Sequence, residues 1–272
     1  MAKVLIGGPI HFYKIYSMSN YLSHIRAMQI YSKHEIDVLL SDNSPDMHFI
    51  EHIHKEIDPE VEILWLKNAP FGSPNSVHLR LVECRNMLRQ RAIDGNYDYF
   101  LSLECDVYAP KNTVDVMISD LPNNNSVISG LYYKRFFKDE FTSGRTPNLS
   151  NGVGVLGLTL IPRNIFSKIT FRHPGKKLGA FDDAYFYQDL DRDGYSHYIT
   201  PNVVAKHDRR CGPEYAILQE TGISKAELIN KHMSRRAKRS RKAKRKPSGA
   251  VKLIQQYLDE LKDLPNAKEA PE

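Results

Sequence analysis

Short apolar runs alternate with amphipathic segments along the first part of the chain. Runs typical of buried strands cover residues 3–6, 35–40, 61–66 and 99–103. Between them, apolar side chains recur at helical spacing over residues 17–32, 47–57 and 76–92. Strands that alternate with helices in this way form a parallel sheet covered by helices on both faces. The sequence therefore predicts an α/β protein with a mostly parallel central sheet flanked by helices.

The second part of the chain has a less regular pattern. It contains predicted strands at residues 126–131, 151–161 and 195–199, a predicted helix at 181–191 and a further apolar run at 203–208. We expect one domain over residues 1–221, followed at 222–272 by a basic segment and an amphipathic helix.

Three acidic side chains follow predicted strands. Asp42 comes after the second strand, and Glu104 and Asp106 come after the fourth. Ligands of open α/β sheets bind at the carboxyl ends of the strands. Alternate residues of a strand point to the same side, so Glu104 and Asp106 would repel each other unless a cation lay between them. A divalent ion with oxygen ligands would supply that charge, whereas the alternative is an acidic turn after an edge strand.

The positive charge is concentrated in one segment. The chain of 272 residues has a formal net charge of +6, and residues 235–246 hold nine Lys and Arg and no acid. Without these nine charges the remainder would carry −3, so the body is mildly acidic. The segment is open to three interpretations: it binds the phosphates of a nucleic acid, lies on an anionic membrane surface, or is a solvated linker. The acids Asp259, Glu260 and Asp263 in the apolar stripe that follows weaken the membrane interpretation.

The cysteines and the apolar runs indicate the compartment. Cys84, Cys105 and Cys211 are odd in number and widely spaced, which disfavours a disulfide framework or a zinc cluster. A reducing, intracellular setting fits this usage, and we expect a cytoplasmic protein. No apolar run approaches the roughly 20 residues of a membrane-spanning helix, so we expect no such segment.

Five motifs occur in one order along residues 3–210. They are the acidic turn Asp42-Asn43-Ser44-Pro45-Asp46, the helical Cys84-Arg85-Asn86, the Glu104-Cys105-Asp106 turn, the glycine-punctuated strand 152–161, and Asp182-Asp183 with Gly194 eleven residues after Asp183. Together they resemble the metal-dependent glycosyltransferases of the GT-A fold, most closely the inverting family 2. Glu104 stands where that family has the first Asp of its Asp-x-Asp motif, and residues 109–150 match none of its patterns.

The resemblance implies a metal site and a base. Asp106, His207 and Glu104 are the expected ligands of Mn²⁺ or Mg²⁺, with Glu104 bound directly or through water. Asp183 is the expected general base, the second acid of the pair that it forms with Asp182. The alternative for either acid of this pair is a helix cap, since acids favour the start of a helix.

The resemblance also implies a donor site for a nucleoside-diphosphate sugar, most simply a uridine one. Asp42 is expected to bond the base, and the backbone at Pro9, in the loop after the first strand, to lie against it. Arg85 and Asn86 belong to the same site, where Arg85 contacts the diphosphate or steadies the acids. An ordinary turn aspartate and an exposed helix charge are the alternatives for Asp42 and Arg85.

The predicted reaction is transfer of a hexose, with inversion, to an acceptor hydroxyl. The basic segment and the intracellular cysteines favour a nucleic-acid acceptor, specifically a hydroxylated base in DNA. One alternative is a transferase that builds surface polysaccharide or glycolipid. Another is a non-catalytic nucleic-acid-binding protein on a transferase scaffold.

Overall fold

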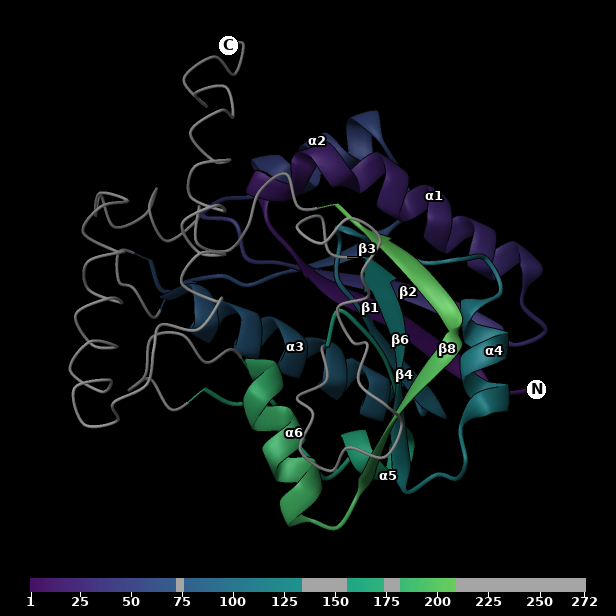
Figure 1. The fold of residues 1–272 in the computed structure, drawn as a ribbon. Coiled ribbons are helices and arrows are strands. Elements are labelled where there is room, and N and C mark those ends of the chain that lie inside the picture. The colour runs from purple at the N-terminus through teal and green to yellow at the C-terminus, as the bar shows by residue number, and fades with distance from the viewer. Residues whose placement is uncertain (72–75, 134–155, 174–181, 209–272) are drawn as a thin grey trace, which may run out of the picture. The chain divides into compact units, whose positions relative to one another are not determined.

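We describe the fold from a computed structural model, which covers residues 1–71, 76–133, 156–173 and 182–208 (Figure 1). The chain divides into two compact units, Met1–Thr221 and Gly222–Glu272, and all described residues belong to the first. The basic segment 235–246 and the amphipathic stripe after it lie outside the described residues. The same holds for Cys211 and for residues 151–155 of the predicted glycine-punctuated strand.

The described residues form a mixed sheet of eight strands, in the order β3-β2-β1-β4-β7-β6-β8-β5. The strands are β1 (Lys3–Ile10), β2 (Glu35–Asp42), β3 (Glu62–Trp65), β4 (Tyr99–Leu103), β5 (Val107–Tyr108), β6 (Ser126–Tyr133), β7 (Leu158–Pro162) and β8 (Ser196–His207). The helices are η1 (Phe12–Lys14), α1 (Ile15–Tyr31), α2 (His48–Glu56), α3 (Ser76–Asp94), α4 (Thr113–Asp120), α5 (Arg163–Phe166) and α6 (Asp182–Arg192).

The parallel half of the sheet confirms the sequence-based expectation. β1 pairs in parallel with β2 and β4, and β2 with β3, so the carboxyl ends of four strands meet at one edge. The other half is mixed: β7 runs antiparallel to β4 and β6, and β5 runs antiparallel to β8, while β6 and β8 are parallel. The sheet is therefore parallel where strands alternate with helices in the sequence.

Helices cover both faces of the sheet (Figure 1). Val4, Ile6 and Leu101 point to the face packed by α1, α2 and α4, whereas Leu5 and Phe100 point to the face packed by α3, α5 and α6. Neighbouring residues of one strand thus enter opposite cores, as the pleat requires. This double burial explains why these strands read as continuous apolar runs in the sequence.

The first strand is longer than the sequence suggests, and this corrects the position of Pro9. Gly7-Gly8-Pro9 reads as the end of a strand, yet β1 continues to Ile10, with Pro9 paired to Ser41. The glycines reflect close packing: a Cβ on Gly8 would collide with the carbonyl oxygen of Leu103, and one on Gly7 would lie 2.9 Å from that of Leu39. Pro9 therefore lies inside the sheet, and the loop begins at His11.

The second part of the sheet also differs from the sequence-based expectation. The two predicted runs at 195–199 and 203–208 are one strand, β8, whose pairing with β6 has an irregular register between Gly130 and Leu131. The helix α4 lies in a segment where we predicted no element from the sequence, and Val114 and Met117 bury one side of it. Such a short helix repeats its apolar spacing too few times to be recognised.

Candidate active site

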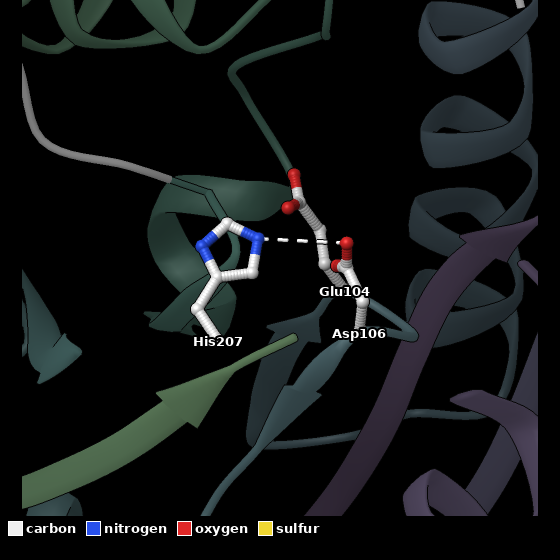
Figure 2. Close-up of side chains that lie close together, drawn as sticks. All are labelled: Glu104, Asp106 and His207. Carbon is white, nitrogen blue, oxygen red and sulfur yellow. Dashed lines mark ion pairs between the residues drawn. The ribbon is translucent and has the colours of Figure 1, made fainter. Parts of the chain in front are cut away.

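Three predicted side chains converge beyond the carboxyl end of β4: Glu104, Asp106 and His207 (Figure 2). One ligand atom from each lies within 4.8 Å of the other two. His207 Nε2 is 3.5 Å from Asp106 Oδ2, and both side chains are only 5% exposed. Two carboxylates and an imidazole are a donor set that suits Mn²⁺ and Mg²⁺, so these residues fit a divalent ion.

Tertiary pairing, rather than strand alternation, brings this cluster together. β4 ends at Leu103, and Glu104 and Asp106 lie in a turn that the Val107 N–H to Glu104 carbonyl bond closes. The expectation that the two acids lie on one side of a strand was therefore wrong, because both follow the end of the strand. Antiparallel pairing of β5 with β8 places Val107 opposite His207 and so delivers the histidine to the turn.

A lysine that the sequence analysis did not single out joins this cluster. Lys14, the last residue of η1, places its Nζ 2.5 Å from Asp106 Oδ2. Burial acts to raise the pKa of Asp106, but Lys14 and His207 outweigh it and hold that pKa well below its usual range. Burial acts in the opposite direction on Lys14, and there the carboxylate of Asp106 prevails and raises the pKa of the ammonium. Asp106 is thus a carboxylate with a cation already beside it.

A second cluster is organised by Arg85, which is 2% exposed on α3. Its Nε donates to Asp182 Oδ2 at 2.6 Å, its Nη1 to Ser102 Oγ at 2.7 Å and its Nη2 to Glu104 Oε1 at 3.1 Å. Of the two expected roles for Arg85, these contacts favour steadying the site acids over binding the diphosphate. The guanidinium links the start of α6 to the metal-site turn.

The two acids of the predicted pair have different surroundings. Asp182 is buried in its ion pair with Arg85. Asp183 is half-buried, and its Oδ1 accepts a hydrogen bond from the N–H of Ala184 at 2.7 Å. Burial, and after it the charge of Asp182, raises the pKa of Asp183 to about 7. Asp183 is therefore suited to accept a proton near neutral pH, while Asp182 is fixed as its neighbour.

Asp42 is buried at the end of β2, and only one of its two carboxylate oxygens accepts hydrogen bonds from described residues. Its Oδ1 accepts from the Ser44 N–H at 3.0 Å and from the Ser44 hydroxyl at 2.7 Å. Its Oδ2 is buried, and no described residue offers it a hydrogen bond. Burial raises the pKa of Asp42 to about 6, against the bonds from Ser44 that lower it. A buried acceptor without a partner costs stability unless a ligand supplies the donor.

His11 has a buried ring nitrogen, Nε2, that can donate a hydrogen bond. The residue follows β1, and its Nδ1 accepts from the Tyr13 N–H at 3.3 Å. Burial, with Arg80 and Lys14, lowers the pKa of His11 to about 3, so the ring is neutral and its proton is on Nε2. No described residue accepts a bond from that buried nitrogen. The Phe12 N–H donates to Ser44 Oγ at 3.0 Å, which ties this segment to the Asp42 turn.

Asn86 is occupied elsewhere. Its Nδ2 donates to the carbonyl of Phe171 at 2.9 Å, and its Oδ1 accepts from the N–H of the same residue at 3.0 Å. Its amide thus holds the segment after α5, and the donor contact expected of Asn86 stays a prediction. Pro9 lies inside β1 opposite Ser41, and Ile10 is the residue opposite Asp42.

Sequence reasoning missed His11, Lys14 and the buried Arg80. Arg80 donates to the Pro70 carbonyl at 2.8 Å and lies over the Phe71 ring, 4.2 Å from its centroid. His11 and Lys14 lie directly after β1, at the same sheet edge as Asp42 and Asp106. Only their position after the first strand could have identified these two residues from the sequence. Because we predicted that this strand ends too early, their position at the sheet edge was not recognised.

Several solved structures resemble this chain in fold. TarS 1-349 from S. aureus is 15% identical, aligned over 97% of this chain and 81% of its own, with a TM-score of 0.55. A second TarS structure is 16% identical at a TM-score of 0.54, aligned over 84% of this chain and 40% of its own, so this chain spans less than half of its length. The mannosyltransferase PcManGT from Pyrobaculum calidifontis, in complex with GDP-Man and Mn²⁺, is 14% identical over 95% of this chain and 80% of its own, with a TM-score of 0.54.

The chain has the GT-A fold. GalNAc-T7, solved with UDP, GalNAc and Mn²⁺, adds a further likeness at 12% identity, over 80% of this chain and 48% of its own, with a TM-score of 0.54. No family model matches the sequence, and no curated protein matches it. Among the described residues, no helix is long and apolar enough to cross a membrane.

Proposed function

We propose that this protein is a metal-dependent glycosyltransferase that moves a hexose from a nucleoside-diphosphate sugar to an acceptor hydroxyl. The observation that carries the proposal is the cluster of Glu104, Asp106 and His207 at the carboxyl edge of a GT-A sheet. PcManGT and GalNAc-T7 were solved with Mn²⁺ and with GDP-Man or UDP, which supports a divalent ion and a nucleotide-sugar donor. We take Mn²⁺ first because a histidine stands among the oxygen ligands.

The three ligands would hold the ion, which supplies positive charge where the departing diphosphate gains negative charge. Arg85 keeps Glu104 in place through its bond to Oε1. Burial of Asp106 and His207 strengthens their electrostatic effect, because little water screens them. The protein thus contributes two buried ligands, Asp106 and His207, and a more exposed one, Glu104.

Asp183 is the proposed base. The acceptor hydroxyl oxygen bonds to the anomeric carbon as the bond from that carbon to the diphosphate oxygen breaks, and the hydroxyl proton passes to Asp183. Attack from the face opposite the leaving group inverts the anomeric centre, so one base suffices. Asp182 supports this role because its charge, after burial, raises the pKa of Asp183.

The base of the donor would bind between Asp42 Oδ2 and His11 Nε2. An ionised Asp42 accepts a hydrogen bond and a neutral His11 donates one. Uracil carries a carbonyl on each side of its N–H, so it meets an acceptor beside a donor in either orientation. Guanine meets this pattern on one side only, and this difference is why we propose UDP ahead of GDP.

For the acceptor we propose a hydroxylated base in DNA. The support is the run of nine Lys and Arg within residues 235–246, which would neutralise phosphates and make binding sensitive to salt. Labelled sugar that appears in polysaccharide or glycolipid, and in no DNA substrate at low salt, would contradict this acceptor. Removal of the chain beyond residue 233 should abolish DNA binding while slow hydrolysis of the donor continues.

A melting-temperature panel tests the donor site. Wild-type protein, Asp106→Asn and the control Asp191→Asn, an exposed acid on α6, are compared with UDP, GDP, CDP and ADP, with and without Mn²⁺. A ligand at 100 times its Kd adds about 2.7 kcal/mol, a shift of several degrees. We expect a Mn²⁺-dependent shift with UDP in the wild-type and control proteins that Asp106→Asn lacks. No shift with any nucleotide would contradict the proposed function.

A further inference from the structure

The ammonium of Lys14 is bound to the carboxylate that the proposed metal site requires. Lys14 Nζ lies 2.5 Å from Asp106 Oδ2, and the same oxygen is 3.5 Å from His207 Nε2. A divalent ion on Asp106 would therefore meet a positive charge in contact with its own ligand. Like charges at such distances in a buried site repel strongly. Either the ion pair opens when the ion arrives, or the ion binds weakly.

The backbone of Lys14 is fixed, but its side chain as a whole is more exposed than that of its partner Asp106. The Lys14 N–H donates to the His11 carbonyl at 2.7 Å, and Ser17 Oγ donates to the Lys14 carbonyl at 2.6 Å. The Lys14 side chain is 20% exposed, whereas that of Asp106 is 5% exposed. A lysine head on a flexible four-carbon stem can turn away from a carboxylate that has no comparable freedom.

We propose that Lys14 is the counter-ion of the unloaded site, which yields Asp106 to the metal and then binds the diphosphate of the donor. This inference rests on the proposed function and adds to it a residue that contacts the donor. The ammonium and the metal can both remain in the site only if an anion lies between them. The diphosphate is that anion, and a lysine binds phosphate oxygens as a point charge.

Arg85 is less suited to this role. Its guanidinium already bonds Asp182, Ser102 and Glu104 and is 2% exposed. Turning Arg85 toward a diphosphate would leave the carboxylate of Asp182 buried without that cation. Lys14 instead pairs with Asp106, the acid that a bound metal ion would take as its ligand.

The proposal makes metal and nucleotide binding interdependent. Mn²⁺ alone must open the Lys14–Asp106 pair, so it binds weakly until the diphosphate provides Lys14 with a new partner. Because coupling between two ligands is reciprocal, UDP and Mn²⁺ strengthen each other's binding by the same factor. A part of that factor is carried by Lys14 and should disappear with its charge.

Binding measurements on the full chain test the inference. Calorimetry gives the affinity for Mn²⁺ alone, and for UDP at saturating Mn²⁺, in wild-type protein, Lys14→Met and Lys14→Arg. The matched control is Lys111→Met, because Lys111 Nζ lies 3.5 Å from the ring centroid of Tyr31 at the opposite end of α1. We expect Lys14→Met to bind Mn²⁺ about tenfold more tightly, ~1.4 kcal/mol, and UDP about tenfold more weakly. Lys14→Arg, which keeps the charge, and Lys111→Met should resemble the wild-type protein for Mn²⁺.

A measurement on wild-type protein covers the case in which Lys14→Met does not fold. Acylation of lysine amines, read by mass spectrometry, reports whether the Lys14 amine is engaged. Labelling of Lys14 should rise several-fold with Mn²⁺ alone and fall again when UDP is added, while labelling of Lys111 stays constant. Lys14 labelling that Mn²⁺ leaves unchanged would overturn the inference.

The outcomes separate the two proposals. If wild-type protein binds Mn²⁺ and UDP, and Lys14→Met shows the same affinities, the role of Lys14 is wrong and the proposed function stands. A variant that binds both ligands more weakly also overturns the inference, because it indicates a purely structural lysine. If wild-type protein binds neither ligand, both proposals fail.

Discussion

The candidate site contains two ion pairs, Arg85–Asp182 and Lys14–Asp106, whose cations are held differently. Arg85 bonds three side chains and is 2% exposed. Lys14 pairs with Asp106 through one ammonium on a 20% exposed side chain. A guanidinium bonded to three side chains is a structural support, whereas an ammonium on a flexible stem can exchange its partner. We therefore expect Arg85 to stay in place when ligands bind and Lys14 to move.

The largest expected effect concerns Asp183. Among the described contacts, Arg85 does not bond this acid directly. Asp183→Asn should lower the transfer rate by about 10²–10⁴-fold, because the variant removes the general base. Since the pKa of Asp183 is raised to about 7, the wild-type rate should rise with pH through about 7 as the base ionises. Steady-state rates measured from pH 5.5 to about 8.5 check both statements.

Asp191→Asn is the matched control for this variant, since Asp191 is an exposed acid of the same helix. Its rate and its pH profile should equal those of wild-type protein. If Asp183→Asn keeps its activity, or keeps the rise with pH, the base is another group.

The second effect contrasts the two cations directly. Arg85→Met should lower the free energy of unfolding by about 3–5 kcal/mol, because it leaves buried Asp182 without its cation. Mn²⁺ should recover none of this loss. Lys14→Met should also lose stability in EDTA, but there Mn²⁺ should recover most of the loss by replacing the missing charge on Asp106.

Urea unfolding of both variants, in EDTA and in Mn²⁺, measures this difference. Recovery of Arg85→Met by Mn²⁺ would show that Arg85 too is exchangeable. Equal losses that persist in Mn²⁺ for both variants would remove the distinction between the two clusters.

The smallest effect concerns Asp42, a carboxylate held by hydroxyl and N–H donors instead of a cation. Asp42→Ala should weaken UDP binding by about 1.5–3 kcal/mol, the range for a hydrogen bond to a charged group. Because the pKa of Asp42 is raised to about 6, wild-type affinity for UDP should fall as the pH drops below about 6 and the acceptor becomes protonated. Calorimetric titration at pH 5 to 8 tests this, and an affinity that Asp42→Ala leaves unchanged would contradict base recognition by Asp42.

The sequence predicted the regular half of the fold well. The strand at 99–103 has the same bounds as β4, and the helix predicted at 76–92 corresponds to α3 (Ser76–Asp94). These elements are recognisable because each buries its side chains in a repeating pattern. The sequence missed α4 and ended the first strand too early, because α4 is short and because the glycines of β1 reflect packing against Leu39 and Leu103.

For the candidate site, the sequence identified acids but not their partners. Asp42, Glu104 and Asp106 were found because they follow apolar runs, and His207 because of a family resemblance. Lys14 is 92 residues from Asp106 in the sequence, and no local pattern links two residues at such a separation. Likewise, Phe171, the partner of the Asn86 amide, is 85 residues away from it in the sequence.

The sequence by itself determined the α/β class, the parallel direction of the first strands and the acids that follow them. These features depend on local periodicity and on where a strand ends. Only the tertiary structure decided that β5 and β8 pair to bring His207 to Asp106. It also decided that Arg85 pairs with Asp182 and that Lys14 pairs with Asp106. The physical reason is that the burial and the pKa of a side chain depend on its neighbours in space. Those neighbours are determined by how the helices pack on the two faces of the sheet.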